Sequence, residues 1–307
     1  MTKAPTSQAH LSEDANVLNG LRQSWSIGIY VGESPLNLNP AGWIVNPVLT
    51  RSDVSDIPAS FVADPFMIRA GDLWHMFFEA KHAVARKGEI GLALSRNGFD
   101  WQYQQIVLAE PFHLSYPYVF ECDGEYYMVP ETLQAKHIRL YKASSFPYHW
   151  THLADLIPGE FADSSIFYFA GTWWMFACSR PFQHDVLRLF CATRLTGPWR
   201  EHPRSPIVDG DPRTARPAGR VIVWGDSLIR YAQDCYPQYG SRVRGFEVLE
   251  LTPTSYHERE CDNSPILSPG ESNWNRDGMH HIDAHFNSDG KWIACVDGSF
   301  RAALLSR

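Results

Sequence analysis

A hairpin pattern that recurs five times is the feature that most constrains how this chain can fold. The first copy is FVADPFMIRAGDLWHMFFEA, residues 61–80, in which Asp64 opens a strand-like run, a Gly-Asp turn follows, and an aromatic strand returns to Glu79. Later copies begin at Tyr116, Asp163, Arg216 and His280. The intervals between successive copies are 52, 47, 53 and 64 residues. A period of this size is typical of repeat folds in which neighbouring units bury each other's faces.

Each of the first four hairpins is followed by a second strand-like run, a turn and an aromatic residue. EIGLALSRNGFDWQ after the first hairpin is one example, with an Asn-Gly turn signal between its two halves. The unit is therefore four short strands. We predict an all-β protein, a five-bladed β-propeller with four antiparallel strands per blade. A two-sheet sandwich would explain the strands but not the repeat.

The segment WSIGIYVG, residues 25–32, is a strand without a neighbouring partner in the sequence. Closing the ring with an N-terminal strand removes the open edge that a propeller would otherwise expose. We expect this strand to complete the last blade. Residues 1–20 are polar and lack periodicity, so we predict a flexible lead-in there and a single propeller domain over 21–307.

Composition and motifs exclude several classes of protein. The net charge is −7 without a run of Lys or Arg, which argues against a nucleic-acid partner. No stretch of 18 apolar residues and no apolar leader occurs, so we predict no membrane span and a cytoplasmic location. The six cysteines form no CxxC pair, and this weakly supports a reducing compartment. GxSxG, P-loop, GxGxxG and HExxH patterns are absent, which removes serine hydrolases, NTPases, dinucleotide enzymes and zinc proteases.

The propeller geometry predicts where chemistry would lie. The first strand of each blade lines the central channel and the second runs back beside it, so the start of the first and the end of the second meet at one face. We expect this face to collect the residues at those positions: Asp64, Tyr116, Asp163, Arg216 and His281, together with Glu79, Glu131, Arg180, Gln233 and Asp234.

Carboxylates around such a funnel suit glycosidic bond cleavage, in which one acid protonates the leaving oxygen and another activates water or attacks. Asp64, Asp163 and Glu131 are the candidates for this set. Structural roles also remain open: Asp64 precedes a proline in a turn-like pair, and Glu131 could be a solvated carboxylate at a strand end. For Glu79, we expect a surface ion pair with the adjacent basic residues.

We predict substrate contacts from eight residues: Tyr116, Arg180, Arg216, Gln233, Asp234, Tyr239, His281 and Asp283. Arg216 could clamp a carboxylate, a phosphate or hydroxyl groups, or could form a structural ion pair with Asp163 or Asp64. Gln233 and Asp234 could bond sugar hydroxyls, with Tyr239 as a stacking platform.

The fifth hairpin carries HHIDAH, where strand alternation places His281, Asp283 and His285 on one side. Three ligands on one strand span about 13 Å at roughly 3.3 Å per residue, too far for one ion to reach all three. A single structural cation near His281 stays compatible with the pattern, and we predict no other cofactor. An acid–base or substrate-binding role and a structural role for His281 stay open as well.

The motifs VADPF, LALSRNGFDW and FADSSIFYFAGTWWMF resemble those of the five-bladed propeller glycosidases of the arabinanase, levansucrase and invertase superfamily (glycoside hydrolase family 43-like). That resemblance implies a base or nucleophile role for Asp64 and an orienting role for Asp163. In those enzymes the acid is a Glu that usually begins a later blade, where this chain has Arg216. More closely, the run from Asn46 to Ile68, YPYVFECDGEYYMVPET and RPAGR resemble the N-terminal propeller-like domain of plant glucosamine inositolphosphorylceramide transferases and its stand-alone bacterial relatives.

The leading hypothesis is an enzyme that acts on a glycosidic bond of a carbohydrate or glycoconjugate. Two alternatives are a glycosyltransferase that uses an activated sugar donor, with Arg180 and Arg216 at the donor phosphate, and a propeller that binds glycans without catalysis.

Overall fold

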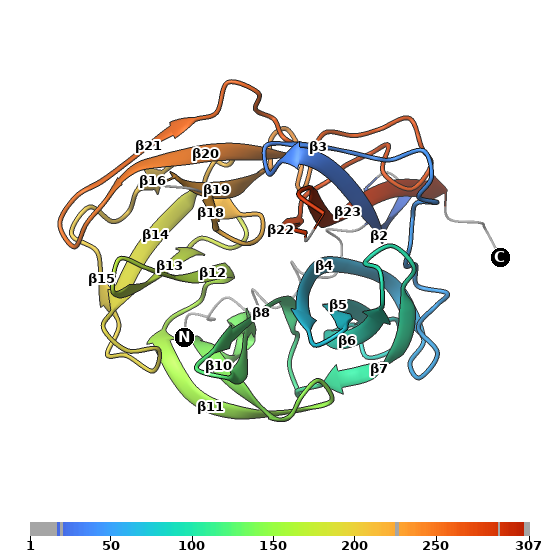
Figure 1. Ribbon diagram of the computed structural model, residues 1–307, viewed down its shortest axis with the longest axis horizontal. Helices are drawn as coiled ribbons and strands as arrows, with labels where there is room; N and C mark the ends of the chain where they lie inside the picture. The colour runs from blue at the N-terminus through green and yellow to red at the C-terminus, as the bar shows by residue number, and fades with distance from the viewer. Residues whose placement is uncertain (1–16, 19–20, 225–226, 288, 304–307) are drawn as a thin grey trace, which may run out of the picture.

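The structure, a computed structural model, describes residues 17–18, 21–224, 227–287 and 289–303. These residues form five antiparallel sheets arranged around a central axis, as Figure 1 shows in the view down that axis. Helical structure among them is confined to one 3-10 turn, η1 (Leu133–Ala135). The predicted five-bladed β-propeller is therefore confirmed.

The first two blades follow the chain in simple order from the channel outwards. Blade 1 consists of β4 (Ala59–Ala70), β5 (Leu73–His82), β6 (Gly88–Ser95) and β7 (Gln102–Leu108). Blade 2 consists of β8 (Ser115–Cys122), β9 (Glu125–Glu131), β10 (His137–Ser145) and β11 (His149–Pro158).

The third and fourth blades carry extra short strands. Blade 3 contains β12 (Ala162–Phe169), β13 (Thr172–Cys178), β14 (Val186–Ala192), β15 (Arg200–Glu201) and β16 (Val208–Asp209). In blade 4 the inner strand is split into β17 (Arg216–Pro217) and β18 (Ile222–Trp224), followed by β19 (Ser227–Asp234), β20 (Arg242–Leu251) and β21 (Tyr256–Glu260). Both split strands pair with β19.

Blade 5 joins the two ends of the chain. It contains β22 (Ile282–Phe286) and β23 (Trp292–Ala303) from the C-terminal part, and β1 (Val17–Leu18), β2 (Leu21–Ser34) and β3 (Asn37–Asn39) from the N-terminal part. β2 pairs with β23 from Leu21↔Ala303 to Gly32↔Trp292. The N-terminal strand thus closes the last blade, as predicted. Pairing between β1 and β2 also begins within the predicted lead-in, whose residues 1–16 and 19–20 lie outside the described residues.

Apolar side chains fill the contacts between neighbouring blades. Phe66, Phe77 and Tyr118 belong to a buried cluster shared by blades 1 to 3, and Ile27, Met76 and Cys295 to one shared by blades 5 and 1. All six cysteines are free thiols. This packing holds the blades in fixed positions, so the ends of their inner strands form a defined surface.

A backbone irregularity recurs at the start of three inner strands. Asp64, Tyr116 and Asp163 have φ angles of 51°, 47° and 50°, and each lies at a register shift between the first and second strands of its blade. Such bulges turn a strand and re-aim its side chains. In blade 4, the corresponding break contains Gly219, where an added Cβ would lie 1.7 Å from the carbonyl oxygen of Ile282.

Candidate functional site

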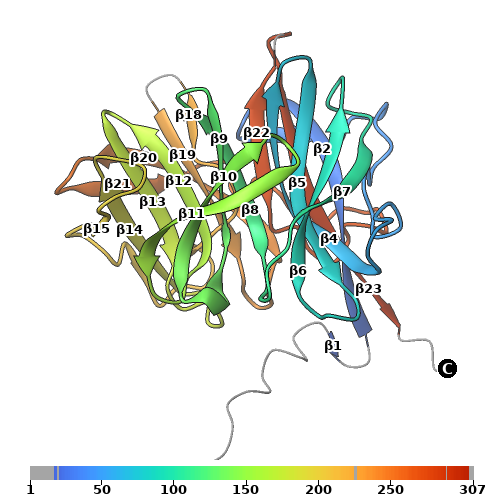
Figure 2. The same ribbon diagram turned by 90° about the horizontal axis from the view of Figure 1, so that it is seen from below.

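The inner-strand starts meet at one end of the propeller. Figure 2 shows β1 and the end of β23 at the same end of the propeller. At the end near β1, all five blades contribute polar side chains that are at most 9% exposed. We call this set the carboxylate cluster: Asp64, Glu79, Glu131, Asp163, Arg216, Gln233, His280 and Asp297.

Arg216 is the positively charged residue on the side of the cluster that blades 2 to 4 form. Its Nε donates to Asp163 Oδ2 at 2.5 Å, and its Nη2 lies 3.5 Å from Glu131 Oε2. Gln233 Nε2 also donates to Asp163 Oδ2, at 2.6 Å. Arg216 Nη1 donates to the carbonyl of Pro181 and contacts His184 Nδ1 at 2.9 Å. The guanidinium is thus committed to protein groups, and Asp163 is fixed in place by two donors.

His280 links two carboxylates on the blade 5 and blade 1 side. Its Nδ1 is 2.7 Å from Asp297 Oδ1, and its Nε2 is 3.7 Å from Asp64 Oδ1. Trp25 stacks on the His280 ring with centroids 3.9 Å apart, which fixes the ring plane. Asp297 also accepts backbone N–H groups from Asp64 and His281. Asp297 therefore ties the bulge of blade 1 to the last blade.

Burial controls the acidity of the remaining carboxyl groups. It raises the pKa of Asp64 well above its ordinary value, and the imidazole of His280 offsets part of that effect. Burial, followed by the charge of Asp163, raises the pKa of Glu131 to about 8 despite Arg216. Burial likewise raises the pKa of Glu79 to about 7, with Lys81 opposing it. Carboxyl groups with such pKa values hold protons near neutral pH, as general acids require.

In the His280–Asp297 pair, the net pKa shifts run opposite to the effect of burial. Desolvation would lower the pKa of His280 and raise that of Asp297, but their hydrogen bond and mutual attraction prevail. The pKa of His280 is therefore raised and that of Asp297 lowered. This favours an imidazolium between carboxylates.

Three side chains of the cluster bring ligand atoms close enough together to be considered as a metal site. One atom each of Asp64, His280 and Asp297 falls within a group no more than 4.8 Å across. However, both ring nitrogens of His280 already face carboxylate oxygens. This donor set fits a protonated imidazole bridging two acids better than a cation.

His281 lies deeper, inside the channel, and does not join the rim. The side chain is fully buried between Phe66 and Tyr116, with ring centroids 4.6 and 5.2 Å away, and neither ring nitrogen has a hydrogen-bond partner among the described residues. Burial lowers its pKa to about 4. His281 is therefore a neutral part of the channel filling, 3.9 Å from Asp64 Oδ1.

Tyr116 and Asp283 are likewise held inside the channel. The hydroxyl of Tyr116 lies 2.8 Å from Ser165 Oγ and accepts the N–H of Gly219 at 2.5 Å. Asp283 accepts Arg220 Nε at 2.7 Å and the N–H of Met67 at 2.7 Å. These contacts occupy both side chains, so the expectation that they contact substrate at the rim is not supported by their placement.

The other predicted contact residues do not all lie at the cluster. Asp234 is 2% exposed and bound by Arg244 at 2.8 Å, so it lies away from Gln233 and the cluster. Tyr239 lies beside the cluster, 5.2 Å from the Arg216 guanidinium carbon. Arg180 is half exposed and pairs with Asp185 at 3.3 Å.

Two loops beside the cluster carry exposed aromatic rings. Phe182 lies in the loop after β13 and is 69% exposed, while Tyr236 lies in the loop after β19 and is 53% exposed. The Arg213 guanidinium covers the Tyr236 ring at 4.3 Å. Exposed flat rings near a polar funnel are suited to stacking on sugar faces.

The surface-pair interpretation of Glu79 is wrong. Glu79 is 5% exposed, its Oε1 lacks a hydrogen-bond partner among the described residues, and its nearest basic atom, His113 Nε2, is 3.8 Å away. Sequence reasoning also missed Asp297 and His280. The signal was available for Asp297, because VDG ends the second strand of its hairpin just as Glu79 and Glu131 end theirs.

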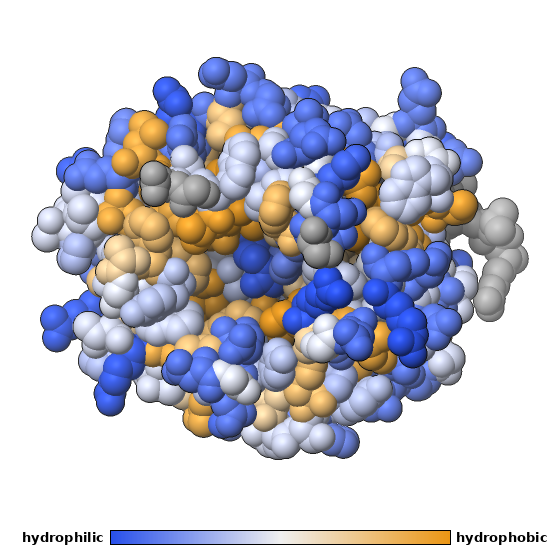
Figure 3. Space-filling view, viewed as in Figure 1, coloured by the Kyte–Doolittle hydropathy of each residue, from blue (hydrophilic) through white to orange (hydrophobic). Residues whose placement is uncertain are grey.

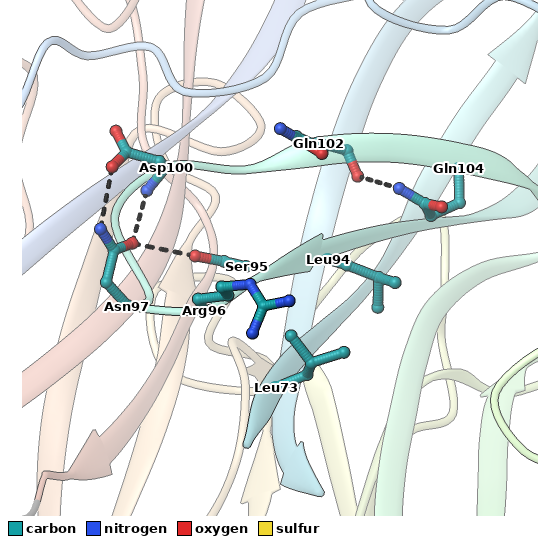
Figure 4. Close-up of a pocket in the computed structure, with 8 residues that line it drawn as sticks. All are labelled: Leu73, Leu94, Ser95, Arg96, Asn97, Asp100, Gln102 and Gln104. Atoms are coloured by element: carbon teal, nitrogen blue, oxygen red, sulfur yellow. Dashed lines mark hydrogen bonds between the residues drawn. The ribbon is translucent and has the colours of Figure 1, made fainter. Parts of the chain in front are cut away.

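The far end of the propeller has its own polar surface. Figure 3 shows hydrophilic side chains gathered in a central hollow and hydrophobic ones around them. A cleft of about 450 Å³ lies on blade 1 between Leu73, Arg96 and Gln104, as shown in Figure 4. Leu73 begins β5 and Glu79 lies near its end, roughly 20 Å apart at about 3.3 Å per residue. Ser95, Asn97 and Asp100 in this cleft bond to one another and build the β6–β7 turn.

Comparisons with solved structures support the fold. A putative glycosidase from Bacteroides thetaiotaomicron has a TM-score of 0.62 at 13% identity, covering 84% of this chain and 95% of its own. A putative glycoside hydrolase from Parabacteroides distasonis has a TM-score of 0.59 at 12% identity, covering 93% and 98%. An α-L-arabinanase from Cellvibrio cellulosa, solved with arabinohexaose, has a TM-score of 0.55 at 14% identity, covering 81% and 94%.

Sequence comparisons give the family. Glucosamine inositolphosphorylceramide transferase 1 from Oryza sativa subsp. japonica is 38% identical over 297 residues, and the protein of that name from Arabidopsis thaliana is 34% identical over 296. Each match covers 90% of this chain but only 40% or 39% of the plant protein, so the chain spans about two fifths of these relatives. The described residues form no helix with the length and apolar character needed to cross a membrane. Residues 19–299 match the family model for the N-terminal region of glucosamine inositolphosphorylceramide transferase 1, and the chain belongs to that family.

Proposed function

We propose that this propeller is an enzyme acting on a glycosidic bond of a carbohydrate or glycoconjugate, with Asp64, Glu131 and Asp163 as its acidic set. The observation that carries the proposal is the pairing of unlike carboxyl groups in one buried cluster. Burial raises the pKa of Glu131 to about 8, whereas Asp163 beside it is held by Arg216 and Gln233. A buried carboxyl group that keeps its proton near neutral pH is suited to general acid catalysis.

Each acid has a distinct role in the proposal. Glu131 holds a proton near neutral pH and donates it to the leaving oxygen. Asp64 lies at the bulge, where burial raises its pKa and His280, 3.7 Å from its Oδ1, opposes that effect. In the proposal Asp64 acts as base or nucleophile once it is ionised, and a charged His280 stabilises that form. Asp163 orients Arg216 and sets the charge around Glu131. Phe182 and Tyr236 on the adjoining loops offer faces for sugar stacking.

Leaving-group dependence tests these roles. The chain and its Asp64→Asn, Glu131→Gln and Asp72→Asn variants would be assayed on matched glycosides with alkyl and dinitrophenyl leaving groups. Loss of general acid catalysis costs about 10²–10⁴-fold. We expect Glu131→Gln to lose that factor on alkyl glycosides but little on dinitrophenyl glycosides, which leave without protonation. Asp64→Asn should lose activity on both.

Asp72 is an exposed carboxylate at the far turn of the same hairpin as Asp64, so Asp72→Asn is the matched control and should keep full activity. Near-full turnover in Asp64→Asn or Glu131→Gln with a folded protein would remove the proposed roles. Tight glycan binding without product by any of the proteins would instead favour a non-catalytic propeller.

A transferase using an activated sugar donor is the second candidate, favoured by the names of the plant relatives. Arg216 is committed to protein groups, so the half-exposed Arg180 is the better donor-phosphate contact. Nucleotide sugars, but not free oligosaccharides, would then stabilise the folded chain, by about 2.7 kcal/mol at a ligand concentration of 100 times Kd. The melting temperature would rise accordingly. Arg180→Gln would abolish that protection.

A further inference from the structure

A second cleft, of about 350 Å³, lies where blade 5 meets blade 1. β2 and β4 lie side by side at this junction (Figure 1). The walls are formed by Ser24 and Ser26 of β2, Ser60 of β4, Pro47, the segment 50–52, Asn273, and the aromatic residues Trp274 and Phe300. Its volume falls within the range of small-molecule sites, about 300–1,000 Å³.

Polar groups in this cleft are left without partners. Within the described part of the chain, the hydroxyls of Ser24, Ser26 and Ser52 and the side-chain amide of Asn273 make no hydrogen bond to the protein. The Ser60 hydroxyl donates to the carbonyl of Lys81 and keeps its acceptor capacity. In the larger cleft of blade 1, by contrast, Ser95, Asn97 and Asp100 bond to one another. The smaller cleft therefore has unused capacity to bond a ligand rich in hydroxyl groups.

The charge in this cleft is positive. Arg51 is exposed on the wall and forms no ion pair with any described residue, and the described lining contains no acidic side chain. The nearby Asp53 carboxylate is instead occupied by the N–H and hydroxyl of Thr50, at 2.7 and 2.9 Å. A free guanidinium is matched to a phosphate or carboxylate group, which it can bind through two N–H donors.

Apolar surface completes the set. Trp274 is 7% exposed, and its indole is held edge-on to Tyr30 with ring centroids 6.5 Å apart. Phe300 is half buried on β23. The partly exposed phenyl ring of Phe300 and the small exposed part of the Trp274 indole offer apolar surface to the C–H groups of a sugar ring, while the hydroxyls bond its edges.

Strand alternation separates this cleft from the carboxylate cluster. Ser24 and Ser26 face the cleft, whereas Trp25 between them stacks on His280. We propose that the cleft is a second binding site, distinct from the carboxylate cluster, that takes a saccharide bearing an anionic group, either phosphate or carboxylate.

Binding by the whole chain tests the proposal. Glucose 6-phosphate, glucuronate, glucose and inorganic phosphate would each be titrated by calorimetry. We expect glucose 6-phosphate or glucuronate to bind with a Kd of about 1 mM or tighter. Glucose and inorganic phosphate should each bind at least about tenfold more weakly, because each offers only half of the contacts. The anionic sugar that binds more tightly shows whether the site prefers a phosphate or a carboxylate group.

Two exposed arginines provide a matched pair of variants. Arg51→Gln should weaken binding of the anionic sugar at least about tenfold. Arg69→Gln makes the same charge change at an exposed residue of β4 near the far turn, and it should leave binding unchanged. Ser24→Ala should weaken the binding of glucose 6-phosphate but not that of inorganic phosphate. Thermal unfolding would verify that all variants are folded.

Three results would overturn the proposal: no binding of either anionic sugar at millimolar concentration, equal binding by Arg51→Gln and the unchanged chain, or glucose or inorganic phosphate binding as tightly as the better of the two anionic sugars. Because the readout is binding, these results do not depend on whether the carboxylate cluster is catalytic.

Discussion

Glu131 is a carboxyl group that the fold keeps protonated by burying it next to other acids. Its pKa is raised from 4.5 to about 8. Between these values the folded chain holds a proton that the unfolded chain has released, so the free energy of unfolding falls as pH rises from about 5 to 8. Glu131→Gln removes this dependence. We expect the variant to gain stability relative to the unchanged chain across that window, on the order of 3 kcal/mol.

Urea unfolding at pH 5, 6.5 and 8 would measure that gain. Glu125→Gln is the control, because Glu125 begins the same strand at the exposed end. If the free energies of unfolding of the unchanged chain and of Glu131→Gln differ by the same amount from pH 5 to 8, a raised pKa at Glu131 would be contradicted.

Arg216 and Asp163 form a buried ion pair, with Nε and Oδ2 2.5 Å apart. Removing one partner of such a pair leaves an uncompensated charge and costs about 3–5 kcal/mol, whereas removing both is far less costly. We expect Arg216→Met and Asp163→Asn each to destabilise the fold strongly, and the double variant to be more stable than the sum of the two changes predicts. A double-mutant cycle from denaturant unfolding measures this coupling. Additive effects would mean that the pair does not interact.

At the scale of the element, the bulged inner strands position the site. Asp64, Tyr116 and Asp163 all have positive φ at the same place in their blades. Aspartate tolerates this conformation better than a bulky residue does, so the backbone of Tyr116 needs support from its surroundings. The phenol hydroxyl supplies it by bonding Ser165 and Gly219, which ties blade 2 to blades 3 and 4.

Tyr116→Phe should therefore lower the free energy of unfolding by about 1–3 kcal/mol, because it leaves the buried N–H of Gly219 without a partner, although Ser165 keeps its hydrogen bond to the carbonyl of Gly219. Tyr168→Phe is the control, since Tyr168 is 56% exposed. We expect it to change stability by less than about 0.5 kcal/mol in chemical denaturation. A Tyr116→Phe variant as stable as the control would show that these bonds add no net stability.

At the scale of the whole molecule, closure of the ring depends on β2. Its long ladder with β23 joins the two ends of the chain and completes blade 5. Deleting residues 1–34 exposes the edge of β23. It also removes Ile27 and Ile29, so the apolar residues that they cover where blades 5 and 1 meet become exposed. We expect the truncated chain to lose its cooperative thermal transition and to bind a hydrophobic dye.

Deletion of residues 1–16 leaves β1 and β2 in place and should preserve the transition. A synthetic peptide covering residues 17–34 should restore cooperative unfolding to the truncated chain when added in trans. Cooperative melting of the truncated chain by itself would mean that ring closure is not required for folding.

Much of the site follows from the repeat, because equivalent positions of a propeller converge. The convergence of Asp64, Glu131, Asp163, Arg216 and Gln233 could be predicted without coordinates. His281, Asp283 and Asp234 could not be placed in this way. At a bulge or a split inner strand the alternation shifts, and a shift of one residue moves a side chain to the other face.

By itself, the sequence determined the five blades, their four-strand unit and the closing N-terminal strand, because hydrophobic alternation and turn residues act over short distances. Only the tertiary structure decided which of the acids are buried, and beside which cations. Glu79 became a member of the cluster, and His280 was placed between Asp64 and Asp297. Burial and charge pairing depend on atoms contributed by blades far apart in the sequence, and those two quantities determine the pKa values on which the proposed chemistry rests.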